Sequence, residues 1–168
     1  MKSFTLTFLF SILLNSVFSQ TSIPELIQSG NQKVQEDDYK GALYFYTKVL
    51  QIEPLNPEAL YYSGIMKYSM QDFMNAINDF DNAAISDTNN VDLFYHRGNA
   101  KFKMKMLNEA LADYNKALVL DSTDQNCLYN RAITLYYLDK KEESCKDLLK
   151  LRKLGAAKAE ELWTELCR

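Results

Sequence analysis

The sequence predicts an all-α protein built as a stack of helical hairpins. Glycine recurs every 34 residues, at Gly30, Gly64 and Gly98, and a fixed period of this length indicates a repeat architecture. Within one period, small and aromatic residues recur at the spacing of a helix face, as at Ala110 and Tyr114. The chain has 168 residues, of which only five are Gly and three are Pro. It is therefore long enough for a short repeat array and too poor in Gly and Pro for a disordered chain.

Residues 1–19 have the pattern of a secretory signal peptide. Lys2 supplies a positive charge, Phe4–Leu14 is an apolar run, and Val17 and Ser19 stand at the −3 and −1 positions before Gln20. We expect cleavage after Ser19 and a periplasmic or secreted mature chain. An uncleaved membrane anchor is the alternative, but the apolar run of about 11 to 15 residues is shorter than the ~20 that a spanning helix needs. No membrane span is expected after cleavage.

Residues 20–168 are predicted to form one repeat domain with units at 23–56, 57–90, 91–124 and 125–158. Three further rows of residues keep the 34-residue spacing. They are Ala42, Ala76, Ala110 and Ser144; Val49, Ala83, Ala117 and Leu151; and Tyr46, Phe80, Tyr114 and Leu148. In the third unit, the break between two helical patterns falls near Met104–Leu107, which suits an antiparallel pair. A bulky side chain at Gly98 would push these two helices apart.

The last segment is predicted to cap the stack. Gly155 follows Leu154 and signals the end of a helix. Residues 159–167 then form a further helical pattern with Leu162, Trp163 and Leu166 on one side. Because the end of a solenoid exposes apolar surface unless something covers it, we expect this helix to cover the fourth unit.

These units resemble the tetratricopeptide repeat, which is a 34-residue helix–turn–helix unit. The resemblance rests on the glycine row, on the Ala-x3-aromatic spacing (Ala76 to Phe80) and on the alanine that follows (Ala83). Pro54 matches the closing proline of the family in the first unit. The resemblance implies a right-handed α-solenoid of about four units with a concave groove. It also implies a non-catalytic protein–protein interaction module.

Some charged residues that differ from the family pattern also recur every 34 residues. Lysine stands three residues after each of the three repeat glycines, where the family usually has tyrosine. An arginine precedes the glycine position in the last two units, and an aspartate recurs in the second helical pattern. These residues are Lys33, Lys67 and Lys101; Arg97 and Arg131; and Asp79, Asp113 and Asp147. Our hypothesis is that Arg97 and Arg131 pair with these aspartates across packed helices. The alternative is solvated surface charge.

The spacing of the three cysteines predicts one disulfide. Cys145 lies 10 residues before Gly155 and Cys167 lies 12 after it, so antiparallel helices about that turn hold the two thiols level. The end of the chain, Cys-Lys-Asp-Leu…Leu-Gly…Cys, also resembles the terminal repeat of secreted bacterial members of the family. Cys127 is about 9 Å out of register with Cys145 along their helices. Because a disulfide needs Cα atoms within ~7 Å, we expect Cys127 to be a free, packed thiol. An intermolecular crosslink is the alternative.

The resemblance places the first helix of each unit along the groove. The candidate partner-binding residues are Asn31, Tyr61, Ile65, Tyr68, Tyr95, Asn99, Phe102, Tyr129, Ile133 and Tyr136. Tyrosine provides apolar contact area at low entropic cost, and asparagine can bond to a peptide backbone. This stripe suits a peptide or a partner helix, although such residues also serve for packing alone. His96 lies one residue beyond the stripe, and we expect it to be a contact residue.

Several classes of function are not expected. With 19 Lys and Arg against 22 Asp and Glu, the chain lacks the basic excess of a nucleic-acid-binding protein. Three Cys and one His are too few for a Cys/His zinc site with ligands to spare. No spacing of a nucleophile, base or phosphate loop occurs, so neither an enzyme nor a cofactor is predicted. Asn31 alone matches the clamp with which some family members bind the acidic tails of heat-shock chaperones.

The prediction is therefore an exported module that binds a protein or peptide in its concave groove. Two alternatives stay open. One is binding of glycans or cell wall through the aromatic stripe. The other is a self-assembling unit, in which the groove of one copy binds the terminal helix of the next through Trp163, so that the chain forms a homo-oligomer.

Overall fold

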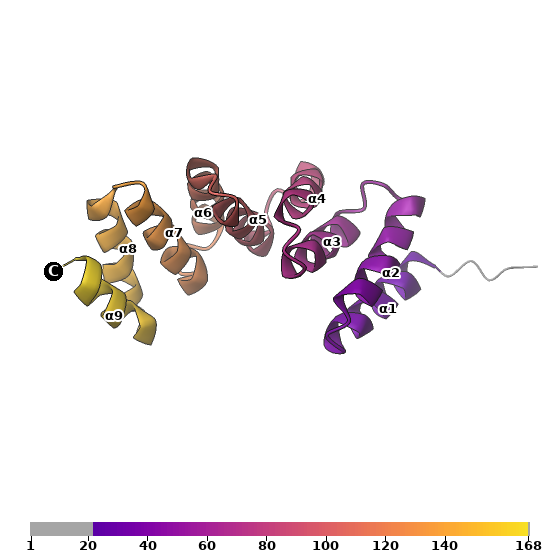
Figure 1. The fold of residues 1–168 in the computed structure, drawn as a ribbon, viewed down its shortest axis with the longest axis horizontal. Coiled ribbons are helices and arrows are strands. Elements are labelled where there is room, and N and C mark those ends of the chain that lie inside the picture. The colour runs from indigo at the N-terminus through magenta and orange to yellow at the C-terminus, as the bar shows by residue number, and fades with distance from the viewer. Residues whose placement is uncertain (1–21, 168) are drawn as a thin grey trace, which may run out of the picture.

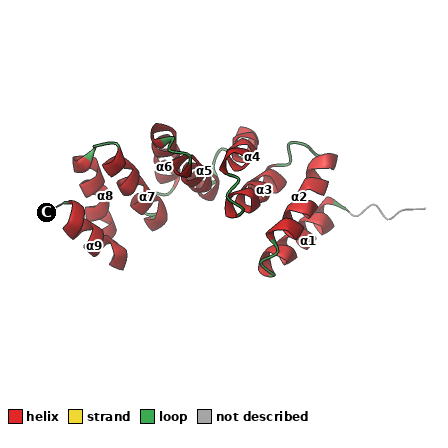
Figure 2. Cartoon of the chain, viewed as in Figure 1, coloured by secondary structure: helices red, strands yellow, loops and turns green. Residues whose placement is uncertain are grey.

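The computed structural model describes residues 22–167, which form an elongated array of nine α-helices (Figures 1 and 2). The signal peptide predicted at 1–19 lies outside these residues. The helices are α1 (Ile23–Gln35), α2 (Tyr39–Ile52), α3 (Pro57–Ser69), α4 (Phe73–Ser86), α5 (Val91–Lys103), α6 (Leu107–Leu120), α7 (Gln125–Tyr137), α8 (Lys141–Lys153) and α9 (Ala157–Leu166). Figure 1 shows α1 and α9 at opposite ends of the array.

Consecutive helices pack as antiparallel pairs, so the predicted all-α solenoid is confirmed. Each unit pairs its two helices, and the second helix of one unit packs on the first helix of the next. The first helices also meet across units, since α3 contacts α5 and α5 contacts α7. The predicted capping helix starts at Ala157 instead of residue 159, because Ala156 is extended (φ −71°, ψ 108°) and the helix begins directly after it. It ends at Leu166, one residue before the predicted end.

Short polar residues set the helix starts with the same 34-residue period. The side chains of Asn56, Asn90 and Asp124 accept hydrogen bonds from backbone N–H groups three residues ahead, which caps α3, α5 and α7. Ser22 and Glu25 form a capping box at α1. The turns inside the four units each contain a residue at positive φ. These residues are Asp37, Gln71, Lys105 and Asp139, with φ between 56° and 64°. None of these four residues is glycine, so the positions of glycine in the sequence do not indicate these turns.

The glycine row lets an aromatic ring of the second helix lie against the first helix. A Cβ atom at Gly98 would lie 2.8 Å from Cε1 of Tyr114, and one at Gly64 would lie 2.6 Å from Cε1 of Phe80. Both distances are shorter than carbon atoms tolerate. This contact confirms the predicted close approach of the two helices. In the fourth unit Ala132 occupies the glycine position, and Leu148 stands where the other units have the aromatic ring.

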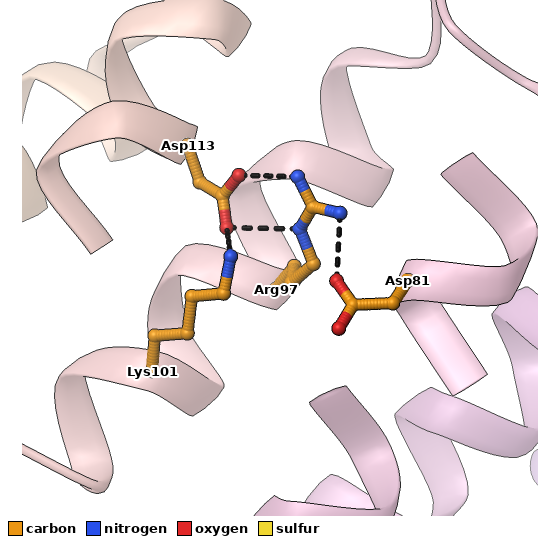
Figure 3. A network of polar contacts seen from close by, with 4 residues as sticks. All are labelled: Asp81, Arg97, Lys101 and Asp113. Carbon is orange, nitrogen blue, oxygen red and sulfur yellow. Dashed lines mark hydrogen bonds and ion pairs between the residues drawn. The ribbon is translucent and has the colours of Figure 1, made fainter. Parts of the chain in front are cut away.

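The hypothesis that Arg97 pairs with an aspartate is confirmed (Figure 3). Its Nε and Nη2 donate to the two carboxylate oxygens of Asp113 at 2.9 and 2.5 Å. Its Nη1 donates to Asp81 of the preceding unit at 2.9 Å, and Lys101 bonds to Asp113 at 2.7 Å. The guanidinium group thus joins α4, α5 and α6. Because Arg97 and Asp113 are largely buried, these bonds are more than surface charge pairing.

Arg131 repeats this arrangement one unit later. It donates to both carboxylate oxygens of Asp147 at 2.7 and 2.6 Å and to Asn115 at 2.7 Å, and so joins α6, α7 and α8. Position 135, which corresponds to Lys101 of the third unit, is leucine, so no lysine bonds to Asp147 from this position. In the second unit, the aspartate of this row, Asp79, accepts hydrogen bonds from Ser63 and Lys67.

The predicted disulfide is present and fastens the capping helix. Cys145 of α8 is bonded to Cys167, with 5.8 Å between the Cα atoms. Leu166 packs into the core of the fourth unit, and the Arg152 guanidinium group lies 5.2 Å from the ring centre of Trp163. Cys127 is wholly buried and free, as predicted. The intermolecular crosslink is wrong, because a buried thiol cannot reach a second molecule. Burial also raises the pKa of this thiol.

Candidate partner-binding site

The ten predicted partner-binding residues lie on α1, α3, α5 and α7, the first helices of the four units. We call the surface that these helices share the first-helix face. Nine of the ten side chains are half-buried, and Tyr136 is exposed. Half-buried residues can both pack and contact a partner, so exposure alone does not identify a site. The hollows of this face are more informative.

A pocket of about 250 Å³ lies on the first-helix face, and we call it the central pocket. Five predicted residues converge there from three helices. They are Tyr68 of α3; Tyr95, Asn99 and Phe102 of α5; and Ile133 of α7. Lys103, Tyr114 and Asn130 complete the lining. The predicted stripe does not include these three, because Asn130 and Lys103 lie one residue beyond it and Tyr114 belongs to a second helix.

Two amides at the pocket have fixed orientations. Asn99 Oδ1 accepts a hydrogen bond from the hydroxyl group of Tyr114 at 2.7 Å and another from Asn130 Nδ2 at 2.8 Å. Burial raises the pKa of Tyr114, so its hydroxyl group stays protonated and continues to donate. Within residues 22–167, Asn99 Nδ2 and Asn130 Oδ1 form no hydrogen bond. One donor and one acceptor therefore remain for a ligand.

The acceptor of Asn31 is likewise already engaged. Its Oδ1 accepts from the hydroxyl group of Tyr46 at 2.7 Å. The predicted role of the asparagines is thus partly internal, since each satisfies a buried tyrosine 15 residues ahead. The sequence contains this signal. Where the later position is Phe80 or Leu148, which have no hydroxyl group, the earlier position is isoleucine.

The other predicted residues lie outside the central pocket. Tyr61 packs against Phe80 and His96 with ring centres 6.2 and 6.0 Å apart. Ile65 belongs to the edge of the same apolar cluster, and Tyr129 packs on the cluster of the fourth unit. Tyr136 is 45% exposed and does not line the pocket. These four contribute to the surface around the pocket and to packing.

One rim of the pocket is basic and aromatic. Lys103 lines the pocket, and Lys105 follows in the turn after α5. The amine of Lys105 lies 5.7 Å from the ring centre of Tyr137, and this ring is 5.8 Å from that of Phe102. Neither lysine forms an ion pair within the described part of the chain. We call Lys103, Lys105, Phe102 and Tyr137 the basic rim.

A second, more open hollow of about 770 Å³ lies at the first unit. Amide side chains line it between α1 and the start of α3. They are Gln28, Asn31, Gln32, Gln35 and Asn56, together with Glu58 and the apolar residues Ile23, Pro24 and Ile27. We call it the amide cleft.

His96 packs among the rings of Tyr61, Phe80 and Tyr95, as expected for a contact residue. Burial lowers its pKa, against a smaller opposite effect of Asp92. Among residues 22–167, no group of three or more His, Cys, Asp or Glu side chains is arranged to hold a metal ion. No helix over the same residues is both long and apolar enough to cross a membrane.

Comparison with known proteins supports the fold of paired helices. Residues 91–124 match the family model of the tetratricopeptide repeat. No curated protein matches the chain in sequence. Among solved structures, MamA protein aligns with a TM-score of 0.76 and 19% identity over 86% of this chain and 85% of that chain. MamA 41-end from Desulfovibrio magneticus RS-1 aligns with a TM-score of 0.77 and 18% identity over 82% and 77%.

A third similar structure contains a peptide. It is the first TPR of Spaghetti (RPAP3) bound to HSP90 peptide SRMEEVD, with a TM-score of 0.68 and 23% identity over 70% of this chain and 93% of that chain. Because all three sequence identities lie below 25%, these structures indicate a shared fold alone. Residues 91–124 therefore match a tetratricopeptide repeat, and the described part of the chain shares the fold of these solved structures.

Proposed function

We propose that this protein is a non-catalytic interaction module that binds a protein or peptide on its first-helix face outside the cytoplasm. The observation that carries the proposal is the central pocket. Side chains from three consecutive first helices converge there around an apolar floor, with an amide donor and acceptor left unengaged. Concave, mainly apolar surfaces with a few polar groups are typical of binding sites.

The likeness to a peptide-bound structure adds support. The first TPR of RPAP3 holds the peptide SRMEEVD on the same fold. The chaperone clamp of the family is not repeated here, because the matching positions hold Ile27, Tyr62, Asp92 and His96 beside Asn31. A different peptide or partner is therefore proposed for this chain.

Export is part of the proposal. It rests on the signal-peptide pattern of residues 1–19 and on the Cys145–Cys167 bond, since disulfides persist mainly in oxidising compartments outside the cytosol. Mass spectrometry of the protein recovered from culture medium and periplasm of the source cells would test it. An N-terminus at Gln20 in either fraction is expected. A full-length chain confined to the cytoplasm would contradict export.

Capture from an envelope extract tests the binding function. Residues 20–168 with the disulfide formed serve as bait beside a pocket variant, Tyr68→Ala/Ile133→Ala. The matched control is Ile85→Ala/Val119→Ala, which removes two apolar side chains exposed by 69% and 79% on the second helices. We expect a partner that the wild type and the control retain and the pocket variant loses. A partner retained equally by all three would refute the first-helix face as its binding site.

Carbohydrate binding is the second candidate, and the amide cleft favours it. Sugar sites combine aromatic faces with amides and carboxylates, and the amide cleft supplies five amides and the carboxylate of Glu58. Calorimetric titration with soluble cell-wall fragments distinguishes the two candidates. Saturable heat that Gln28→Ala/Gln32→Ala abolishes would favour the carbohydrate, and its absence would favour the protein partner.

A further inference from the structure

We infer that the central pocket takes one large apolar side chain of an extended peptide segment, and that the basic rim holds a carboxylate beside that side chain. This inference rests on the proposed function and specifies the partner by its chemistry. Three properties of the site carry it: the size of the pocket, the orientation of its amides and the charge of its rim.

The size of the pocket fits a side chain better than a small molecule. Its volume of about 250 Å³ is below the roughly 300–1,000 Å³ that small-molecule sites occupy. Tyr68, Tyr95, Phe102 and Ile133 supply an apolar lining that is already half-buried. A leucine or phenylalanine side chain that enters would remove this lining and itself from water, which is the main source of affinity in such anchors.

The amide pair favours an extended backbone over a helix. Asn99 Nδ2 can donate to a backbone carbonyl group, and Asn130 Oδ1 can accept from a backbone N–H group. The hydrogen bond between Asn130 Nδ2 and Asn99 Oδ1, at 2.8 Å, links the two amides and, among residues 22–167, leaves one donor and one acceptor group free at the pocket. In a bound helix the backbone N–H and C=O groups are paired internally, so they leave both amides without partners. In an extended segment those groups are free.

The rim favours a carboxylate in the segment. Lys67 and Lys101 of the same repeat row are neutralised by Asp79 and Asp113. Lys103 and Lys105 have no such partner within residues 22–167. Because Lys103 itself lines the pocket, a carboxylate one or two residues from the anchor side chain can reach its amine. Lys105 and the ring of Tyr137 extend the same surface outward.

The site differs in position from the chaperone clamp. It lies at the C-terminal end of α3, along α5 from Tyr95 to Lys103 and in the middle of α7, and it takes its cations from the end of α5 and the following turn. None of the clamp positions of the family contributes to it.

Fluorescence anisotropy with defined peptides tests the inference on the full mature chain. The probe is a labelled peptide of about ten residues with one central Leu flanked by Glu in a Gly/Ser background. Three comparison peptides replace Leu by Ala, Glu by Gln, or Glu by Lys. We expect at least about a tenfold weaker Kd with Ala, since a buried Leu contributes that much. A loss of up to about fivefold is expected with Gln, because the ion pair is exposed.

Variants then assign each contact. Lys103→Gln should remove the preference for Glu over Gln, and the control Lys158→Gln, an exposed lysine on α9, should keep it. Asn130→Ala should weaken binding about tenfold, because an amide partner of the peptide backbone is lost. Asn108→Ala on the outer helix α6, where the asparagine side chain is exposed, should leave binding unchanged.

Methyl NMR gives a readout that needs no variant. On titration with the peptide, the δ1-methyl signal of Ile133 should shift, and that of the outward-facing Ile85 should stay in place. Equal affinity for the Ala peptide would overturn the anchor, and equal affinity for the Lys peptide would overturn the role of the rim. If no peptide moves Ile133 while a captured partner still depends on Tyr68 and Ile133, the inference fails and the proposed function stands.

Discussion

The third and fourth units fold into the same pair of antiparallel helices but pack them with different residues. In the third unit Gly98 accommodates the ring of Tyr114, and Asn99 accepts the hydrogen bond of its hydroxyl group. In the fourth unit the same three positions are Ala132, Leu148 and Ile133. The residues have changed as a set, because a smaller partner allows the Cβ atom of alanine and removes the need for an acceptor.

The buried aspartates differ in the same way. Among residues 22–167, Asp113 has two cationic partners, Arg97 and Lys101, whereas Asp147 has one, Arg131. The fourth unit also has a covalent bond that the third lacks, between Cys145 and Cys167. The repeat geometry is thus set by matched groups of residues. The loss of one member should therefore matter more where no second member supports it.

Removal of the arginines should give the largest difference between the units. Arg131→Ala leaves Asp147 buried without a cation, and breaking a buried pair in this way costs about 3–5 kcal/mol. Arg97→Ala leaves Lys101 beside Asp113, so we expect roughly half that loss. Urea unfolding measures both. Equal losses for the two variants would mean that Lys101 does not compensate, and no loss in either would assign both pairs to solvated surface charge.

Removal of the disulfide should destabilise the end of the array by a similar but smaller amount. The bond closes a segment with a sequence separation of 22, for which the chain-entropy relation gives about 3 kcal/mol. In Cys145→Ser/Cys167→Ser, amide hydrogen exchange should quicken in α8 and α9 and change little in α5. As a control, reductant should destabilise the wild type and leave the double variant unchanged. Uniform acceleration along the chain would contradict a local cap.

Transfer of the fourth-unit pairing into the third unit tests the matched packing. Gly98→Ala places a Cβ atom against Tyr114 and should cost about 1–3 kcal/mol, although alanine favours the helix. Tyr114→Leu alone leaves a cavity and also costs stability. The double variant Gly98→Ala/Tyr114→Leu should lose less free energy of unfolding than the two single variants together. The double-mutant cycle should give an interaction of about 1–2 kcal/mol. Strict additivity would show that the two positions do not constrain each other.

The features that repeat with a fixed period can be predicted from the sequence. The four units, the Arg97 and Arg131 pairs and the Cys145–Cys167 bond follow from spacing along helices, which a one-dimensional pattern contains. The central pocket was only half predicted. Asn130 and Lys103 each lie one residue beyond the stripe, and Tyr114 comes from a second helix, so the spacing that defines the stripe does not include them.

The role that the sequence predicts for the asparagines is also incomplete. The stripe predicts that Asn31 and Asn99 contact a partner, whereas their side-chain oxygens accept hydrogen bonds from the hydroxyl groups of Tyr46 and Tyr114. The pairing connects positions 15 residues apart on different helices, so it becomes visible only when units are compared with one another.

The smallest predicted effect on stability concerns His96. The corresponding position in the fourth unit is Asn130. Burial lowers the pKa of His96 below its ordinary value of 6.5, so the folded state binds this proton less readily than the unfolded state. The free energy of unfolding should therefore fall as the pH drops below about 6.5, by at most about 1.4 kcal/mol per pH unit, until the folded state is protonated too.

The variant His96→Asn, which copies the fourth unit, isolates this contribution. Urea unfolding of wild type and variant between pH 7.5 and about 5 should show a wild-type decline that the variant lacks, because most carboxylates titrate at lower pH. Asp92 opposes the effect of burial, so Asp92→Asn should steepen the wild-type decline. Parallel curves for wild type and His96→Asn would show that His96 titrates alike in the folded and unfolded chains. The aromatic cluster of Tyr61, Phe80 and Tyr95 would then not shield the imidazole from water.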